Sequence, residues 1–222
     1  MTDFTEQIHR IKEKLVLAKK VDKHFSAFGA ASHKYALDPP ASIAEVEAFE
    51  KRYGIRLPEG YRAFVLNIGN GGASFHNSGA GPYYGIYPLG NYLDDLILKD
   101  KDVERHLKKT CMLFPGLSEK QWDKLTDPLY SEGISDADFA ELNGTLYGGI
   151  LPLGTQGCSY IHALVLSGPY CGRIVNMARS EQMEPRFSSG ENFLDWYEQW
   201  LDEIISGNLI RNSPSWFGYP TN

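Results

Sequence analysis

The chain has 222 residues, 42% of them apolar and 13% aromatic, and it carries a formal net charge of −6. This composition supports one large domain with a packed core and excludes a disordered chain. The acidity argues against a general nucleic-acid binder, which needs a basic face to displace counterions. No apolar run approaches the roughly 20 residues that span a bilayer, and the N-terminal segment lacks the pattern of a secretion signal. We therefore expect a cytoplasmic protein that acts neither on a membrane nor directly on nucleic acid.

The three cysteines, Cys111, Cys158 and Cys171, are an odd number and do not make a disulfide framework. Together with His162 they also lack the spacing of a zinc site. The acidic residues between 94 and 104 lack the glycine and the terminal glutamate of a calcium loop. We expect no metal and no cofactor.

The two ends of the chain differ in charge. A helix is predicted over residues 4–20, because its apolar residues recur at helical spacing, and a Gly- and Pro-rich loop follows over 25–41. Residues 1–24 carry a net charge of +2, whereas residues 181–222 carry −5. The acidic end would attract a basic partner, or its acids simply form a solvated helix face.

The segment 42–72 predicts two helices with clear boundaries. Ser42 and Glu45 have the spacing of a capping box, and Gly54 suits the left-handed conformation that ends a helix. Pro58 fits the first turn of the second helix, where its missing N–H is not needed. Apolar residues then recur at i, i+3, i+4 and i+7, which is typical of a helix that packs on one face.

The period changes after this helix pair. Residues 73–89 are rich in Gly, Tyr and Phe and predict short strands joined by turns. The hexapeptide GIYPLG at 85–90 returns as GILPLG at 149–154. We interpret the two copies as strands that end in the same way, with a proline where a backbone donor is not needed.

The segment 93–146 between the two copies is charged and predicts short helices around 100–110 and 118–126. The segment ends near Asn143-Gly144. We interpret it as an insertion in a sheet-based domain and not as a second domain. The single domain 1–222 then consists of an N-terminal helix (4–20), a core (about 40–92 and 147–205), the insertion (93–146) and a C-terminal tail (208–222).

The last part of the chain predicts a hairpin followed by a helix. Residues 159–175 contain two β-rich runs around a Gly-Pro turn. Ser188 and Glu191 have capping-box spacing, and an aromatic and aliphatic stripe follows over 193–204, which belongs in a core. The tail contains Trp216 among turn residues and either packs on the domain or serves as a contact peptide.

The order of these motifs resembles the SUKH superfamily. A capped helix with Phe-Glu is followed by Gly, Leu-Pro, Tyr-x-x-Phe and Asn-Gly-Gly, and later by Leu-Pro-Leu-Gly, a hairpin and a closing helix. The resemblance covers about two thirds of the chain. The matching positions are Ser42, Val46, Phe49, Glu50, Gly54, Leu57, Pro58, Tyr61, Phe64, Asn70, Gly71, Leu151, Pro152, Leu153, Gly154, Gly157, Gly172, Ile174, Phe193, Leu194 and Leu201.

The resemblance implies an α+β fold, a mainly antiparallel sheet flanked by helices, here with an inserted helical segment. Bacterial members of the superfamily act as immunity proteins that bind and neutralise toxins, often nucleases, and a fungal branch consists of cell-wall and signalling regulators. The superfamily is not known as an enzyme family, so the resemblance implies no catalytic residues. We therefore expect a non-enzymatic module that binds a protein partner, a toxin domain such as a basic nuclease.

Five residues are candidates for contact with that partner. Tyr83 and Tyr84 follow a Gly-rich turn, and tyrosines there are large, amphipathic and easily ordered in an interface. Asp94 and Asp95 form an acidic contact patch or the solvated caps of an inserted helix. Trp216 is the candidate in the tail.

Two alternatives stay open. A regulator or adaptor would use the insertion and the tail to dock on its partner. A thiol hydrolase would use Cys158, but His162 lies roughly 13 Å along a strand from it, too far for direct proton transfer. The fold would have to bring His33, His76 or His106 to the thiol. The simpler interpretation of Cys158 is a small buried thiol at the start of a strand.

Overall fold

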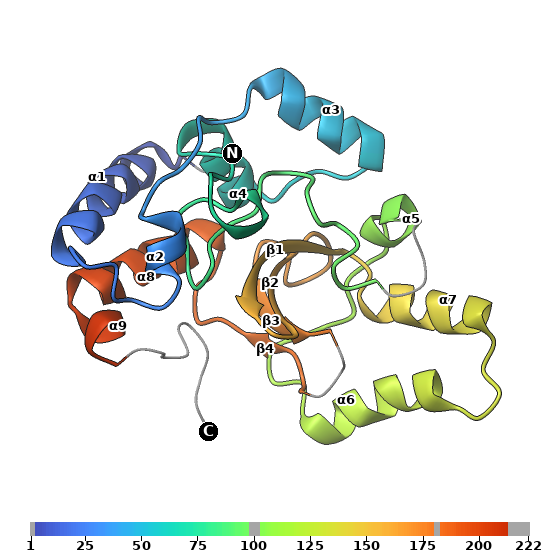
Figure 1. Cartoon of the computed structure of the whole chain (residues 1–222). Helices are drawn as coiled ribbons and strands as arrows, with labels where there is room; N and C mark the ends of the chain where they lie inside the picture. Colours follow the sequence, from blue (N-terminus) through green and yellow to red (C-terminus); the bar gives the residue numbers. More distant parts are fainter. Residues whose placement is uncertain (1–2, 98–102, 180–182, 213–222) are drawn as a thin grey trace.

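The computed structural model describes residues 3–97, 103–179 and 183–212. Within these ranges an antiparallel sheet of four strands lies at the centre, with helices around it (Figure 1). The strands pair in chain order as β1 (Ile150–Gly157), β2 (Tyr160–Val165), β3 (Ile174–Ala178) and β4 (Arg186–Phe187). The predicted α+β fold and the predicted hairpin are confirmed.

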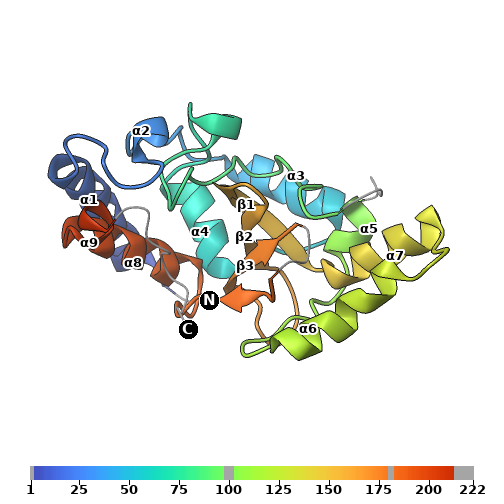
Figure 2. The same ribbon diagram turned by 60° about the horizontal axis from the view of Figure 1, so that its bottom comes forward.

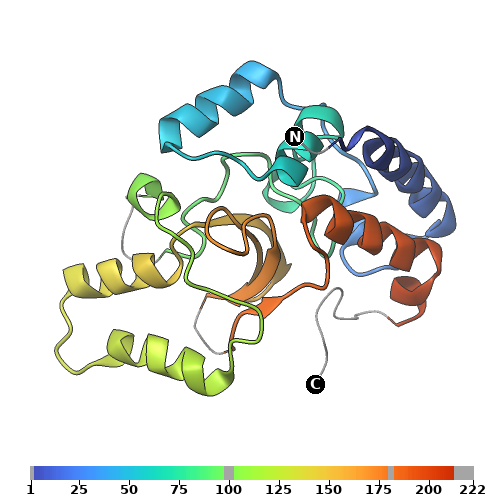
Figure 3. The same cartoon turned by 180° about the vertical axis from the view of Figure 1, so that it is seen from behind.

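The helices gather on two sides of this sheet. Figures 1 and 3 show α1, α4, α8 and α9 on one side and α6 and α7 on the other. The helices are α1 (Thr5–Val21), α2 (Ala30–His33), α3 (Ile43–Tyr53), α4 (Glu59–Asn67), α5 (Val103–Leu107), α6 (Glu119–Thr126), α7 (Asp136–Leu146), α8 (Phe193–Ile205) and α9 (Asn208–Arg211), with 3-10 turns η1 (Phe75–Asn77) and η2 (Asp127–Tyr130).

The predicted boundaries of α3 and the predicted start of α4 are confirmed. The Ser42 N–H donates to the Glu45 carboxylate (2.7 Å), and the Glu45 N–H donates to the Ser42 hydroxyl (3.2 Å), which is the reciprocal capping box. Helix α3 ends at Gly54, whose φ of +59° is left-handed. Helix α4 begins directly after Pro58.

The boundary predicted for the last helix is wrong. Asn192 caps α8, because its side-chain oxygen accepts the backbone N–H groups two and three residues later (2.8 and 3.2 Å). Ser188 is buried, and its N–H donates to the carbonyl of Ile174 in β3 (2.9 Å). Ser188 therefore extends the sheet edge and does not form a capping box with Glu191. The apolar stripe of α8 is confirmed as core.

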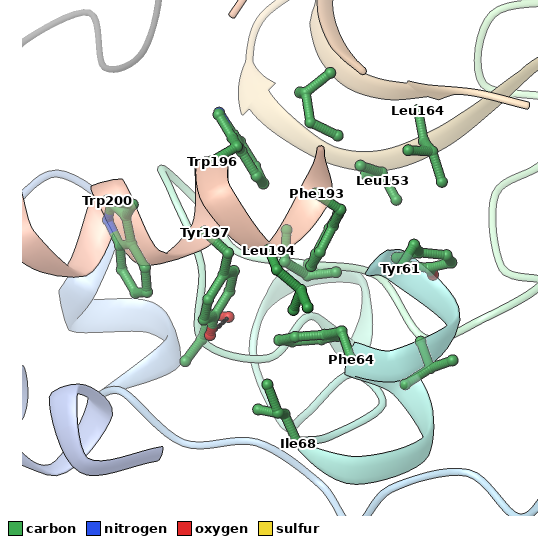
Figure 4. Close-up of a cluster of buried hydrophobic side chains, with 14 of the residues drawn as sticks. Tyr61, Phe64, Ile68, Leu153, Leu164, Phe193, Leu194, Trp196, Tyr197 and Trp200 are labelled. Atoms are coloured by element: carbon green, nitrogen blue, oxygen red, sulfur yellow. Dashed lines mark hydrogen bonds between the residues drawn. The ribbon is translucent and has the colours of Figure 1, made fainter. Parts of the chain in front are cut away.

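One core lies between the sheet, α4 and α8 (Figure 4). The ring of Phe193 lies 5.0 Å from that of Tyr61 and 4.9 Å from that of Phe64. Leu153 and Leu164 from the sheet belong to the same buried cluster. Side chains of this size each stabilise the fold by about 1.5–3 kcal/mol when fully buried.

A second core covers the other face of the sheet. The segment 93–146 supplies half of it, including Trp122 with only 1% of its surface exposed. Its buried members from this segment are Leu96, Ile97, Cys111, Leu113, Leu117, Trp122, Leu129 and Leu146, and its members from the sheet are Ile150, Ile161, Ala163, Val165, Val175, Met177 and Phe187. The insertion is therefore the second cover of the sheet and not a peripheral appendage.

The strands predicted over 73–89 are wrong. This segment contains the 3-10 turn η1 and one bridge between Gly79 and Ile86. Gly85 and Gly90 have left-handed φ values of +97° and +86°, which turn the chain where a strand would extend it.

The interpretation of the repeated hexapeptide is also wrong. Residues 149–154 run into the middle of β1, whereas residues 85–90 form a loop that lies against it. The Tyr87 N–H donates to the carbonyl of Leu153 (2.7 Å). A Cβ at Gly154 would lie only 2.1 Å from a carbonyl oxygen of that loop, so the glycine permits the close approach.

Among the described residues of the insertion, α7 is a helix that its sequence did not predict. Helices α5 and α6 fall within the two predicted stretches, although residues 100–102 lie outside the described ones. Ser135 caps helix α7, since its hydroxyl accepts the Asp138 N–H (3.1 Å), and the helix includes Gly144. The ring of His106 packs so closely there that a Cβ on Gly144 would lie 1.8 Å from it. The glycine therefore permits this close packing inside the helix.

The oppositely charged ends of the chain pair with each other. Helices α1 and α8 pack side by side, and Glu198 of α8 accepts hydrogen bonds from Arg10 (3.0 Å), Lys14 (2.9 Å) and Gln7 (3.1 Å). Lys14 also pairs with Asp202 (2.6 Å). Burial alone would raise the pKa of Glu198, but these donors outweigh it and hold the pKa at about 2. Part of the acidic C-terminal surface is thus neutralised within the molecule.

We expect Glu198→Gln to lower the free energy of unfolding by about 2 kcal/mol at pH 7, because Arg10 and Lys14 lose a buried anionic partner. A depressed carboxyl pKa stabilises the fold above pH 4.5 and loses that contribution as the pH falls toward 2. Urea unfolding at pH 7 and pH 3 should therefore show a smaller difference between variant and wild type at pH 3. An equal difference at both pH values would contradict the ion pair as its source.

Candidate functional site

An open pocket of about 560 Å³ lies beside the end of the sheet. Three parts of the chain form most of its wall: the loop 75–95, the turn between β1 and β2, and the residue that follows β3. The residues that line it are Ser32, Phe75, His76, Tyr84, Asp95, Thr155, Gly157, Cys158 and Arg179.

The loop that forms the pocket is anchored to both the sheet and α8. Besides the contact of Tyr87 with β1, the hydroxyl of Tyr197 in α8 donates to the Ala80 carbonyl (2.8 Å). The Ala80 N–H donates in turn to the Ala36 carbonyl (2.7 Å). A loop held at several points offers a pre-formed wall, which lowers the entropy lost on binding.

Unusual backbone conformations gather around the pocket. His76, Asn77, Tyr92 and Cys158 all have φ values between +51° and +56°. Residues other than glycine rarely adopt these positive φ values, and they keep them only when surrounding contacts impose the conformation. Such positions are typical of functional surfaces.

A row of aromatic rings borders the pocket, and we call it the aromatic ridge: Phe28, Tyr84, Phe75, His76 and Tyr92. Neighbouring ring centroids along it lie 5.4, 6.1, 3.9 and 4.3 Å apart, so the rings support one another. Phe75 is 58% exposed and Phe28 36% exposed. Exposed aromatic side chains held in place are typical anchors of protein interfaces.

Two residues that line the pocket form an ion pair. Arg179 Nη2 lies 2.6 Å from one oxygen of Asp95, and the Tyr87 hydroxyl donates to the other (3.0 Å). The Asp95 side chain is 12% exposed and that of Arg179 37%. Burial and the neighbouring Asp95 carboxylate raise the pKa of Tyr87, so its hydroxyl stays a donor at any physiological pH.

The structure brings two of the five candidate contact residues together. Tyr84 and Asp95 line the pocket. Tyr83 is buried, with its ring 5.2 Å from that of His162. Asp94 is exposed but borders a separate hollow next to α3 and α5, and Trp216 lies outside the described residues.

Phe75 and Arg179 were not predicted as pocket residues, and His76 was considered only as a possible base for Cys158. Phe75 and His76 adjoin the same Gly-rich turn as Tyr84, so their position offered a signal. Arg179 had none, because only the fold brings it to Asp95.

The surroundings of Cys158 differ from the predicted buried thiol. Cys158 is exposed and lines the pocket together with His76, one of the three histidines that the fold could have brought to it. His33 and His106 are buried elsewhere. The carboxylate in the pocket, Asp95, bonds Arg179 and Tyr87 and does not orient the His76 ring.

A second surface feature is the helix pair α6 and α7, which lies on the side of the sheet opposite to α1 and α8 (Figure 2). We call residues 119–141, which comprise α6, η2 and most of α7, the acidic arm. It carries seven acidic residues and two lysines, a net charge of −5, and all seven acids are exposed. Tyr130 in η2 is 67% exposed. Glu141 pairs with Arg105 (3.1 Å) and Lys109 (2.7 Å) behind the arm.

Two kinds of site are not found in the described part of the chain. Residues 3–97, 103–179 and 183–212 contain no group of three or more His, Cys, Asp or Glu side chains placed to hold a metal ion. Over the same residues, the helices are too short or too polar to cross a membrane.

The family model of the SMI1 / KNR4 family (SUKH-1) matches residues 40–199, more than two thirds of the chain. The chain belongs to the SUKH-1 family. SUKH-1 proteins are generally non-enzymatic binding modules that serve as immunity proteins or regulators. The SUKH-1 match spans the sheet, most of α8 and the acidic arm, and α1 lies outside it. No curated protein and no solved structure matches the chain.

Proposed function

We propose that this SUKH-1 protein is a cytoplasmic immunity protein that binds and neutralises a cognate toxin domain of a bacterial polymorphic toxin system, with a basic nuclease as the favoured partner. The acidic arm is the observation that carries the proposal, because it concentrates a charge of −5 in one exposed helical hairpin of a chain whose net charge is −6. Membership of a family of binding modules supports it.

The physical mechanism is electrostatic steering followed by occlusion. A nuclease holds its substrate on a basic surface, and an acidic arm is attracted to that surface before contact, which raises the association rate. Tyr130, exposed at the turn of the arm, then becomes buried in the interface and slows dissociation. The bound arm blocks the surface that the substrate needs.

The test is co-expression with the toxin encoded beside this gene. The variant Asp123→Lys/Asp127→Lys/Glu132→Lys reverses three exposed charges on the arm. We expect it to slow association with the toxin about tenfold or more at low salt and to lose protection of the cells. The matched control Glu6→Lys/Glu47→Lys/Glu191→Lys makes the same change in total charge at exposed positions outside the arm, and should retain protection.

Wild-type protein that forms no complex with the neighbouring toxin and fails to protect cells would contradict the proposal. A neighbouring gene that encodes no toxin would instead favour the regulator or adaptor.

A thiol hydrolase is the second candidate, favoured by the presence of Cys158 and His76 in one pocket. An imidazole that takes the thiol proton would activate the sulfur as a nucleophile. An iodoacetamide probe should then label Cys158 rapidly in the native protein, and His76→Gln should slow this labelling. A labelling rate that His76→Gln leaves unchanged would dispose of this candidate.

A further inference from the structure

The charge that a ligand meets in the pocket is positive. Of the two formally charged residues that line it, Asp95 has both oxygens engaged, by Arg179 and by the Tyr87 hydroxyl. The Arg179 side chain is about three times more exposed than that of Asp95. A guanidinium has five N–H donors, and the bond from Nη2 to Asp95 leaves others for a ligand. The buried acid fixes the guanidinium, and the guanidinium faces the pocket.

The uncharged side chains of the lining are of two kinds. Phe75 and Tyr84 of the aromatic ridge form an apolar side, with their ring centroids 6.1 Å apart. Ser32 and Thr155 supply hydroxyl groups, and Cys158 supplies a thiol. A pocket of about 560 Å³ is in the range that encloses a small ligand or a short peptide end.

We propose that this pocket binds a carboxylate that adjoins an apolar or aromatic side chain, and that its source is the C-terminal residue of the partner polypeptide. Guanidinium groups match the planar geometry of a carboxylate, and a chain terminus places that carboxylate directly beside its own side chain. The carboxylate bonds Arg179 while the side chain packs on Phe75 and Tyr84. The proposal rests on the proposed function, because it takes the ligand from a protein partner. Arg179 would then be a second contact for that partner, opposite in charge to the acidic arm.

The concave shape favours a chain end over a flat surface. The loop 75–95, the turn between β1 and β2, and Arg179 all line the pocket, so an entering group meets the aromatic rings, Gly157 and Cys158, and the guanidinium. A side-chain carboxylate in the middle of a partner helix would bring its neighbouring backbone against the ridge. A terminal residue has chain on one side only and avoids that clash.

The experiment uses small probes and the full chain without any toxin. ¹H–¹⁵N NMR spectra would follow the amide signals of Thr155, Gly157 and Cys158 during addition of N-acetylphenylalanine, N-acetylphenylalanine amide or the N-acetyl-Phe-Glu amide dipeptide. We expect the free acid to bind in the millimolar range, as suits a fragment, and the amide to bind at least tenfold more weakly. Equal binding of acid and amide would overturn the proposal, and tighter binding of the dipeptide would overturn the assignment to a chain terminus.

Two variants separate recognition from folding. Arg179→Met should abolish binding of the free acid, but it leaves Asp95 buried with one partner fewer. The double variant Arg179→Met/Asp95→Asn removes that buried charge and should also fail to bind. The control Arg186→Met removes an arginine that pairs with Glu184 outside the pocket and should bind as the wild type does.

Binding that persists in the folded double variant would overturn the role of Arg179. Because no toxin is present, a negative result here leaves the neutralisation assay unaffected. Failed neutralisation by the variants of the acidic arm likewise says nothing against this pocket.

Discussion

We expect Trp122→Ala to lower the free energy of unfolding by about 3–5 kcal/mol, the usual cost of removing a large buried aromatic side chain. Trp122 is 1% exposed and belongs to the cluster that covers the second face of the sheet. The loss comprises the buried surface of the indole and the cavity that the sheet and α6 cannot close. For a chain of this length the thermal midpoint should fall by on the order of 10 °C.

The control for this prediction lies in the same arm. Tyr130→Ala also removes a large aromatic ring, but from a side chain that is 67% exposed, so its effect on stability should stay within about 0.5 kcal/mol. Calorimetry and urea unfolding of both variants would make the comparison. A cost below about 1 kcal/mol for Trp122→Ala would mean that the insertion is a detachable appendage.

This packing also decides how the insertion can be studied. Deletion of 93–146 would uncover the face of the sheet that carries Ile161, Val165 and Met177, which are fully buried. The truncated chain would expose that surface, so loss of partner binding could not be assigned to lost contacts. Point substitutions on the exposed side of the arm avoid this problem.

The features that could be predicted from the sequence are those set by near neighbours. The capping box of Ser42 and Glu45 and the end of α3 at Gly54 depend on residues within one turn of each other. The apolar stripe of α8 likewise depends only on helical spacing. The order of such local features was sufficient to indicate the family and hence the fold.

The errors arose where distant residues decide the local structure. Helix α7 was not predicted, and its Gly144 is explained by a distant residue, because the ring of His106 takes the space of the missing Cβ. The loop around Tyr87 resembles a strand, but its backbone donor bonds the middle of β1. Neither partner can be identified from the residues on either side.

The candidate site depends even more on contacts between residues that are distant in the sequence. The tyrosines beside the Gly-rich turn were identifiable as interface material, and Tyr84 does line the pocket. The ion pair of Arg179 with Asp95 joins residues from separate parts of the chain, so only the folded arrangement reveals it. The complementary charges of α1 and α8 were visible in the sequence, but their pairing depends on how the two helices lie together.

We expect the protein to lose stability steeply between pH 6.5 and pH 4, because two histidines are buried in their neutral form. His162 lies on β2 between the rings of Tyr83 (5.2 Å) and Trp196 (5.1 Å), and burial lowers its pKa to about 3. Burial also lowers the pKa of His33 to about 4, against the attraction of Asp22. In the unfolded chain both would titrate near 6.5.

Acid destabilises the fold because both histidines have a lower pKa in the folded state than in the unfolded chain. Between the folded and unfolded pKa the unfolded chain binds more protons, so the stabilising contribution is complete above pH 6.5 and is lost as the pH falls toward 3. A tenfold change in proton concentration is worth about 1.4 kcal/mol, so each histidine costs about 2 kcal/mol at pH 5. The two together remove about 4 kcal/mol, a large share of the stability of a typical domain.

His162→Gln tests this assignment, because glutamine stays polar beside the Gln156 amide, which lies 3.3 Å from the His162 ring, but cannot take up a proton. Urea unfolding from pH 7 to pH 4 should show about half the wild-type loss of stability for this variant. His9→Gln, which changes a histidine whose side chain is 73% exposed, should retain the full loss. Equal pH dependence in wild type and His162→Gln would place the acid sensitivity elsewhere. Glu198 is not such a source, because its pKa of about 2 confines its contribution to pH values below 4.5.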